Sequence, residues 1–158
     1  MVKKILIAIG ILVLLGGGYG LYKYLQPPRD VQKAKVDVVT TTKALVAEYL
    51  KNKDAANKKY LSSDGDSKIF AISGKVSSIS ENAEKAKVIK LKEDGGKVAI
   101  SCTFTLEATK TPETAKLKEG DMVTIKGQIT TGPEYDKDFE EYSDIVMIQC
   151  ALKPADKK

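Results

Sequence analysis

Five stretches of alternating apolar and polar residues constrain the fold of this chain more than any other feature. An alternation with a period of two is typical of a β-strand that buries one face. It predicts strands over residues 69–80, 86–92, 97–106, 121–131 and 144–152. Ile79 falls out of the alternation of the first strand, which predicts a bulge near residues 74–78. The run Glu93-Asp94-Gly95-Gly96 predicts a hairpin turn between the second and third strands.

The alternation also predicts which side chains face the core. The inward residues are Val98, Ile100, Cys102, Phe104 and Leu106 on the third strand, and Val146, Ile148, Cys150 and Leu152 on the last. A short helix is predicted over residues 112–117, between the third and fourth strands. Five strands with a helical insertion at that position are the layout of the OB-fold, a small Greek-key barrel. The sequence therefore predicts a mainly β domain over residues 61–153 and a disordered tail over residues 154–158.

An amphipathic helix is predicted before the barrel, over residues 38–60. Its apolar face repeats at helical spacing and consists of Val38, Thr42, Leu45, Val46, Tyr49, Ala56 and Tyr60. Asp37 is the expected N-cap. The paired prolines Pro27 and Pro28 stop any preceding helix, so residues 26–37 are expected to be a linker.

The first 25 residues contain 18 consecutive uncharged residues, from Ile5 to Tyr22. This length is close to the minimum for a transmembrane helix. The tyrosines and the lysine at the end of the run are residue types that are typical of a membrane interface. Residues 1–25 are therefore predicted to be an uncleaved signal anchor. A cleaved secretion signal, with Gly18 or Gly20 before the cut, is the alternative. Both interpretations export the remainder of the chain, although the flanking charges alone do not set the orientation.

The net charge of +5 and the pI near 9.0 raise the question of nucleic acid. Residues 24–60 contain eight basic and four acidic residues, a net charge of +4, whereas residues 61–158 contain 15 lysines and 17 acids, a net charge of −2. The positive charge thus lies outside the barrel. Lys90 and Lys92 are expected on an outward face, but no aromatic side chain for base stacking accompanies them.

The sequence also resembles a known family, the tRNA_anti-like OB-fold proteins, over residues 38–152. The matching residues are Asn52, Ala56, Tyr60, Ile72, Ser73, Gly74, Lys75, Val76, Ile79, Ile100, Cys102, Phe104, Leu117, Gly120, Asp121, Val123, Thr124, Gly127 and Cys150. The polar insertion at residues 62–67 departs from the family pattern. The resemblance implies an anchored or exported bacterial protein without a known active site, and its name implies likeness of fold to anticodon-binding domains rather than RNA binding.

Cys102 and Cys150 are predicted at inward positions of the third and fifth strands, which are neighbours in a closed OB barrel. In an exported domain two such thiols are expected to form a disulfide, and the barrel is then expected to face an oxidising compartment such as the periplasm. The alternative is a pair of free buried thiols that pack as small apolar residues.

The loop over residues 132–143 combines acids with aromatic residues and is the predicted ligand contact. Its candidate contacts are Tyr135, Phe139 and Tyr142, with Asp136, Asp138 and Glu140. This composition suits a basic peptide or protein, or a carbohydrate. A calcium site is not predicted, because the glycine of an EF-hand loop is missing. The alternative is a solvated hairpin tip whose aromatic residues fold back on the barrel.

Several classes of function are excluded or disfavoured by composition. The chain has no His, which removes Ser-His-Asp and Cys-His catalysis and His-ligated zinc. No metal site, cofactor or catalytic residue is predicted. The sequence therefore predicts a membrane-anchored, extracytoplasmic OB-fold module that binds a protein or peptide partner and is not an enzyme. The alternative function is binding of single-stranded nucleic acid through Lys90 and Lys92.

Overall fold

The computed structural model describes residues 30–62 and 67–153. The predicted membrane segment at residues 5–22, the first part of the linker and the tail at residues 154–158 lie outside the described residues. Most of the polar insertion at residues 62–67 does so too. Within the two described ranges, no helix is long and apolar enough to cross a membrane.

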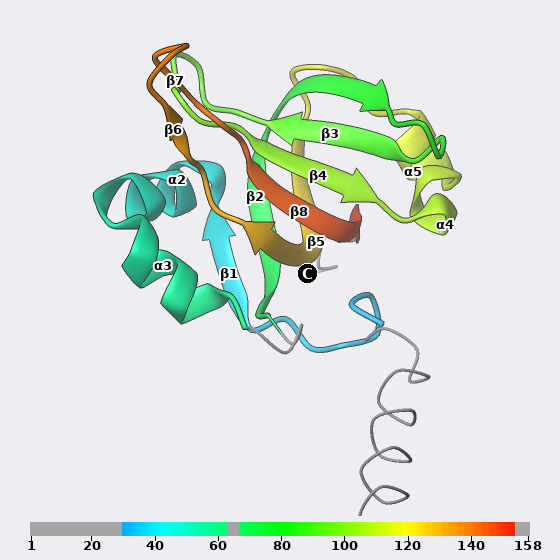
Figure 1. Ribbon diagram of the computed structural model, residues 1–158. Coiled ribbons are helices and arrows are strands. Elements are labelled where there is room, and N and C mark those ends of the chain that lie inside the picture. The colour runs from blue at the N-terminus through cyan, green and yellow to red at the C-terminus, as the bar shows by residue number, and fades with distance from the viewer. Residues whose placement is uncertain (1–29, 63–66, 154–158) are drawn as a thin grey trace, which may run out of the picture.

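The described chain is mainly β (Figure 1). Its elements are β1 (Val38–Thr41), α2 (Thr42–Lys51), α3 (Lys53–Tyr60), β2 (Ile69–Glu81), β3 (Lys87–Leu91), β4 (Ile100–Phe104), α4 (Leu106–Thr109), α5 (Pro112–Ala115), β5 (Met122–Thr131), β6 (Tyr135–Asp136), β7 (Glu141–Tyr142) and β8 (Ile145–Leu152).

Five strands close into a barrel. They follow one another in the order β2-β3-β4-β8-β5, and β5 pairs again with β2 to complete the circle. β4 and β8 run parallel side by side, which confirms the expectation that the third and fifth predicted strands are neighbours. The predicted bulge in the first barrel strand is also confirmed, because the β2–β3 register shifts between Val76 and Ser78. The helices α2 and α3 lie together on one side of the barrel, and α4 and α5 lie at another end (Figure 1).

The inward face of β8 differs from the prediction. The buried residues are Ile145, Met147 and Cys150, whereas Val146 and Ile148 are only half-buried. Gln149 has a φ of 52°, and the β5–β8 register shifts there. This β-bulge adds one residue to β8 and reverses the side-chain alternation. The predicted inward positions of Val146 and Ile148, which precede Cys150, were therefore wrong.

The third predicted strand ends earlier than its alternation indicated. Leu106 was expected inward but begins α4 and is 49% exposed. The Thr105 hydroxyl accepts the N–H of Ala108 and caps this short helix. Local capping therefore overrides the alternation, which holds for Ile100, Cys102 and Phe104.

The predicted single helix over residues 38–60 is in fact a strand and two helices. The β-branched run Val38–Thr41 forms β1, which pairs in parallel with β2. Thr41, rather than Asp37, is the N-cap of α2, while the Asp37 carboxylate accepts the Ile69 N–H. Asn52 separates the helices and caps α3. The predicted buried face is nevertheless confirmed at Thr42, Leu45, Tyr49, Ala56 and Tyr60.

The two helices are bonded to each other and packed on the barrel. Glu48 of α2 accepts from the Lys59 amine at 2.6 Å and from the Tyr60 hydroxyl at 2.7 Å. The hydrogen bond from Lys59, followed by that from Tyr60, lowers the pKa of the Glu48 carboxyl. The Tyr60 ring meets the Phe70 ring of β2 edge-on, with centroids 5.0 Å apart. Phe70 thereby joins the α2–α3 pair to the barrel core.

Tyr49→Phe is predicted to keep or raise stability at neutral pH. Tyr49 is buried and its hydroxyl has no hydrogen-bond partner among the described residues. Removing an unsatisfied buried hydroxyl recovers a desolvation cost of about 1 kcal/mol. Burial, with smaller effects of Tyr60 and Glu48, raises the pKa of Tyr49 to about 12.

The raised pKa gives this prediction a second readout. Between about pH 10 and pH 12 the folded protein keeps the Tyr49 proton that the unfolded chain loses, so stability falls as the pH rises. Denaturant unfolding of wild type and Tyr49→Phe across this range should show a shallower decline in the variant. Equal slopes would contradict the assignment of this proton to Tyr49.

Candidate functional site

The predicted contact loop forms a short hairpin between β5 and β8. Its strands β6 and β7 pair Tyr135 with Tyr142 and Asp136 with Glu141. At the turn, the Asp136 carboxylate accepts the backbone N–H groups of Asp138 and Phe139 at 2.9 and 3.3 Å. Across residues 30–62 and 67–153 the structure brings together no group of three or more His, Cys, Asp or Glu side chains that could hold a metal ion.

The three aromatic residues of the hairpin have different environments. The Tyr135 and Tyr142 rings lie against each other, with centroids 4.9 Å apart. Tyr142 packs against the core, while Tyr135 is 50% exposed. Phe139 is 77% exposed at the tip. The alternative prediction, in which the aromatic residues of this loop fold back on the barrel, therefore holds for Tyr142 but not for Phe139.

The carboxylates of the hairpin divide into paired and unpaired groups. At the base, Glu134 lies 2.6 Å from the Lys53 amine of α3, whose hydrogen bond lowers the pKa of Glu134. Asp144, which follows the hairpin, lies 2.7 Å from the Lys90 amine of β3. In the described part of the chain, the exposed carboxylates around the tip make no ion pair; they are Asp136, Asp138, Glu140 and Glu141. With the exposed Lys137 as its one cation, the tip is thus a net negative rim around one exposed phenyl ring.

Two hollows flank the hairpin, and Tyr135 and Tyr142 line both of them. The first has a volume of about 430 Å³ and lies against α2 and α3, where Lys51 and Lys53 contribute to its wall. The second, of about 470 Å³, lies against the turn between β3 and β4. Its charged residues are Lys92, Lys97, Glu140, Glu141 and Asp144. Each hollow could therefore receive side chains of a partner bound at the hairpin.

The proposed nucleic-acid contacts lie beside acids rather than on an open basic surface. Lys90 is paired with Asp144, and Lys92 lines the second hollow beside Glu141. Within β3 and β4, both fully described, the only aromatic side chain is Phe104, which is buried. β3 and β4 themselves therefore supply no exposed aromatic side chain for base stacking, although Tyr135 of the hairpin lies in the same hollow as Lys92.

Cys102 and Cys150 are both buried free thiols in the structure, on the neighbouring strands β4 and β8. The Cys102 thiol donates to the Ile100 carbonyl at 3.8 Å. Burial, and next the contact with Cys102, raises the pKa of the Cys150 thiol. Their adjacency is compatible with both the free thiols and the predicted disulfide, which stays a prediction.

Protein purified from its native envelope is predicted to contain a Cys102–Cys150 disulfide. Closing this loop of 48 residues should stabilise the fold by roughly 2–4 kcal/mol relative to the reduced form. Intact mass after alkylation in denaturant, with and without reductant, is the measurement. Two alkylated thiols in the sample that received no reductant would contradict the prediction. Cys102→Ala provides the one-thiol control.

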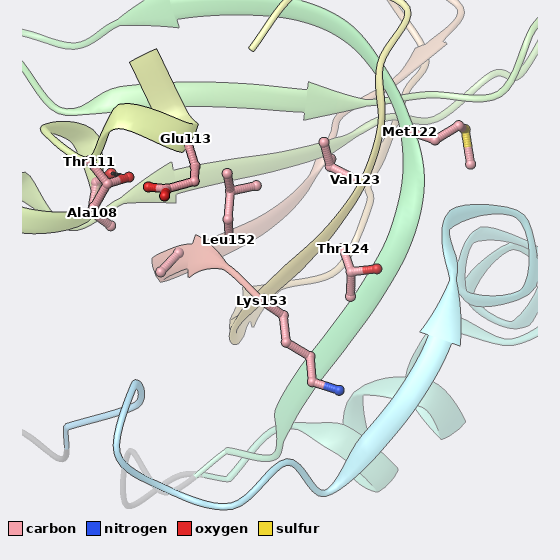
Figure 2. A pocket seen from close by; sticks show the side chains of 9 residues that line it. Ala108, Thr111, Glu113, Met122, Val123, Thr124, Leu152 and Lys153 are labelled. Carbon is pink, nitrogen blue, oxygen red and sulfur yellow. Dashed lines mark hydrogen bonds between the residues drawn. The ribbon is translucent and has the colours of Figure 1, made fainter. Parts of the chain in front are cut away.

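An apolar pocket that the sequence analysis missed lies at the α4–α5 end of the barrel (Figure 2). Its volume is about 600 Å³. It is lined by Ala108, Thr111, Glu113, Met122, Val123, Thr124, Ala151, Leu152 and Lys153. The pocket joins the ends of β5 and β8 to two four-residue helices. Alternation could not reveal it, because residues 105 and 106 were assigned to the third strand and α4 was not predicted.

Comparison with known proteins gives one family and a set of structures. A family model described as tRNA_anti-like matches residues 1–136. No curated protein matches the sequence. Among solved structures, the chain is similar to a protein of Klebsiella pneumoniae subsp. pneumoniae MGH 78578 that is described as a "putative nucleic acid-binding lipoprotein". The sequence identity is 16% and the TM-score 0.48, over 81% of this chain and 99% of that chain.

Proposed function

The chain belongs to the tRNA_anti-like family, and from this premise we propose that it is a non-catalytic OB-fold binding module. In this proposal residues 5–22 anchor it in the membrane, and the barrel lies outside the cytoplasm. Its partner is a protein or peptide with a basic, partly apolar segment. The β6–β7 hairpin is the surface that binds this segment.

One observation carries the proposal: Phe139 is 77% exposed within a rim of carboxylates that form no ion pair in the described chain. A large aromatic side chain that is buried on binding is a frequent source of interface energy. The carboxylates attract a basic partner and discriminate against an acidic one. The rim would repel the phosphates of a nucleic acid for the same reason.

Phe139→Ala is predicted to weaken partner binding by about 2 kcal/mol, or roughly thirtyfold, without loss of stability. The partner is identified by crosslinking the full-length protein in its native envelope, followed by mass spectrometry. Affinity for the identified segment, made as a synthetic peptide, is then measured for each variant. Leu106→Ala is the matched control, because Leu106 is also an exposed apolar residue but lies on α4, away from the hairpin. An unchanged partner set after Phe139→Ala would contradict the proposal.

The electrostatic part of the proposal has its own measurement. Neutralising Asp138, Glu140 and Glu141 to the corresponding amides should slow association with the basic peptide and flatten its salt dependence. Glu81, the last residue of β2, and Glu84, in the turn that follows, provide an exposed acidic control pair. If neutralising the control pair slows association equally, the hairpin carboxylates act only through the net charge of the protein, and not through their position.

The second candidate function, binding of single-stranded nucleic acid, is supported by Lys90 and Lys92 and opposed by the acids beside them. Labelled single-stranded DNA and RNA are the probes. A salt-dependent shift that is lost in Lys90→Gln and Lys92→Gln would replace the peptide-binding proposal with this function. A shift that survives both substitutions would locate the contact elsewhere.

A further inference from the structure

The pocket at the α4–α5 end offers its occupant mainly apolar contacts. Figure 2 shows Leu152 of β8 pointing toward α5, between Glu113 and Val123. The pocket volume of about 600 Å³ lies within the range of small-molecule sites. Its location differs from that of the hairpin, which lies at the other end of β5.

The hydroxyl groups of the pocket are already hydrogen-bonded within the protein. Thr111 donates to the Ala108 carbonyl and bonds Thr114, and the Thr124 hydroxyl lies 2.8 Å from that of Ser73. Because these hydroxyl groups already have hydrogen-bond partners, they do not require polar atoms of a ligand. Met122 at the pocket is 72% exposed, and its flexible side chain can follow an apolar chain of varying shape. The lining favours a long aliphatic group.

The pocket lies on the same strand pair that holds the first described residues. The Lys126 amine of β5 donates to the carbonyls of Gln32 at 2.8 Å and Ala34 at 2.6 Å. The Gln32 side chain donates to the Gln149 carbonyl of β8. Lys126 pairs with Ala151, which lines the pocket. The position at which the described chain begins is thus fixed next to the pocket.

Only residues 23–29 separate the membrane segment from this position. Seven residues reach at most about 25 Å when fully extended. An anchored barrel would therefore keep its α4–α5 end near the lipid surface. Lys110, Lys116 and Lys118 are exposed on and beside these helices, but the exposed acids Glu107, Glu113, Glu119 and Asp121 lie in the same segment. The apolar lining of the pocket, rather than the charge around it, therefore selects the occupant.

We propose that this pocket holds an acyl chain of a lipid from the adjacent bilayer. The inference rests on the membrane anchoring in the proposed function and is independent of the hairpin. The occupant follows from the apolar lining and the short connection to residues 5–22. Lipid binding would hold the barrel in one orientation to the membrane.

The test uses the full chain in nanodiscs of phosphatidylethanolamine and phosphatidylglycerol that carry a photoactivatable acyl chain. After irradiation, mass spectrometry maps the labelled peptides. Label is expected at residues 122–124 and 151–153, and also at residues 5–22 as the internal reference. Val123→Trp, which fills the pocket, and Met122→Glu, which places a charge at its mouth, should each reduce pocket labelling about tenfold, equivalent to about 1.4 kcal/mol.

Val39→Glu is the matched control, because Val39 is 74% exposed on β1 and does not line the pocket. It should leave the pocket label unchanged, and thermal melts establish that each variant is folded. Label at residues 5–22 without label in the pocket would overturn the inference while anchoring stands. Label in the pocket alone would support acyl binding and overturn anchoring. Pocket label that neither variant reduces, or no label at either place, would overturn the inference. Loss of the hairpin partner affects none of these outcomes.

Discussion

Phe70→Ala is expected to reduce the free energy of unfolding by about 3–5 kcal/mol, which is a large share of the stability of a domain of this size. Phe70 is fully buried at the start of β2 and contacts the Tyr60 ring of α3. Truncation leaves a cavity at the junction of the helices and the barrel. Chemical denaturation followed by circular dichroism measures the change.

Phe139→Ala is the natural control, since it makes the same chemical change on a side chain that is 77% exposed. Its effect on stability should stay within about 0.5 kcal/mol. The two variants thus separate a phenylalanine that supports the fold from one that is available to a partner. Comparable destabilisation by both would mean that the hairpin tip packs on the barrel in solution, and would weaken the binding proposal.

Gly74→Ala is expected to destabilise the fold by about 2–3 kcal/mol, because the added methyl group has no space. A Cβ at this position would lie 2.0 Å from the Thr42 hydroxyl oxygen and 3.1 Å from the Thr42 Cβ. Thr42 is fully buried at the start of α2, so relief requires α2 to move away from β2. Thermal and denaturant unfolding of the purified variant measure the loss.

Two further variants isolate the cause. Gly95→Ala has no heavy atom within 4 Å of the new Cβ, and its cost of about 1 kcal/mol arises from a φ of 73° instead. Thr42→Ala in the Gly74→Ala background removes the closest atom and should recover part of the stability, with a positive coupling in the double-mutant cycle. Full additivity of the two substitutions would contradict a contact between these positions.

The barrel could be predicted from the sequence because its strands bury one face each. The alternation placed β2, β3 and β5 within two residues of their observed ends, and the turn at Gly95 was expected from its glycines. The errors occur where a local interaction opposes the pattern. The bulge at Gln149, the cap at Thr105 and the break at Asn52 each depend on backbone conformation rather than on hydropathy. β1 depends on a partner strand that is distant in sequence.

The candidate site was predictable only in composition. The sequence indicated that aromatic residues and acids alternate over residues 132–143, but it contained no information on which carboxylates would be neutralised. Lys53 and Lys90, which pair with Glu134 and Asp144, belong to elements that are distant in sequence. The exposure of Phe139 follows from the turn that Asp136 stabilises. The pocket of Figure 2 depends on the relative placement of α5, β5 and β8, which no local pattern contains.

The position of β8 has a consequence for synthesis of the chain. Among the strands of the described residues β8 comes last in the sequence, yet it lies between β4 and β5, which are made before it. Until Leu152 has left the ribosome, the barrel cannot close, and the edge of β4 at residues 100–104 has no partner strand. Such an unpaired apolar edge can pair with other chains. A newly made chain therefore exposes this edge to other chains until β8 has been made and has paired with β4.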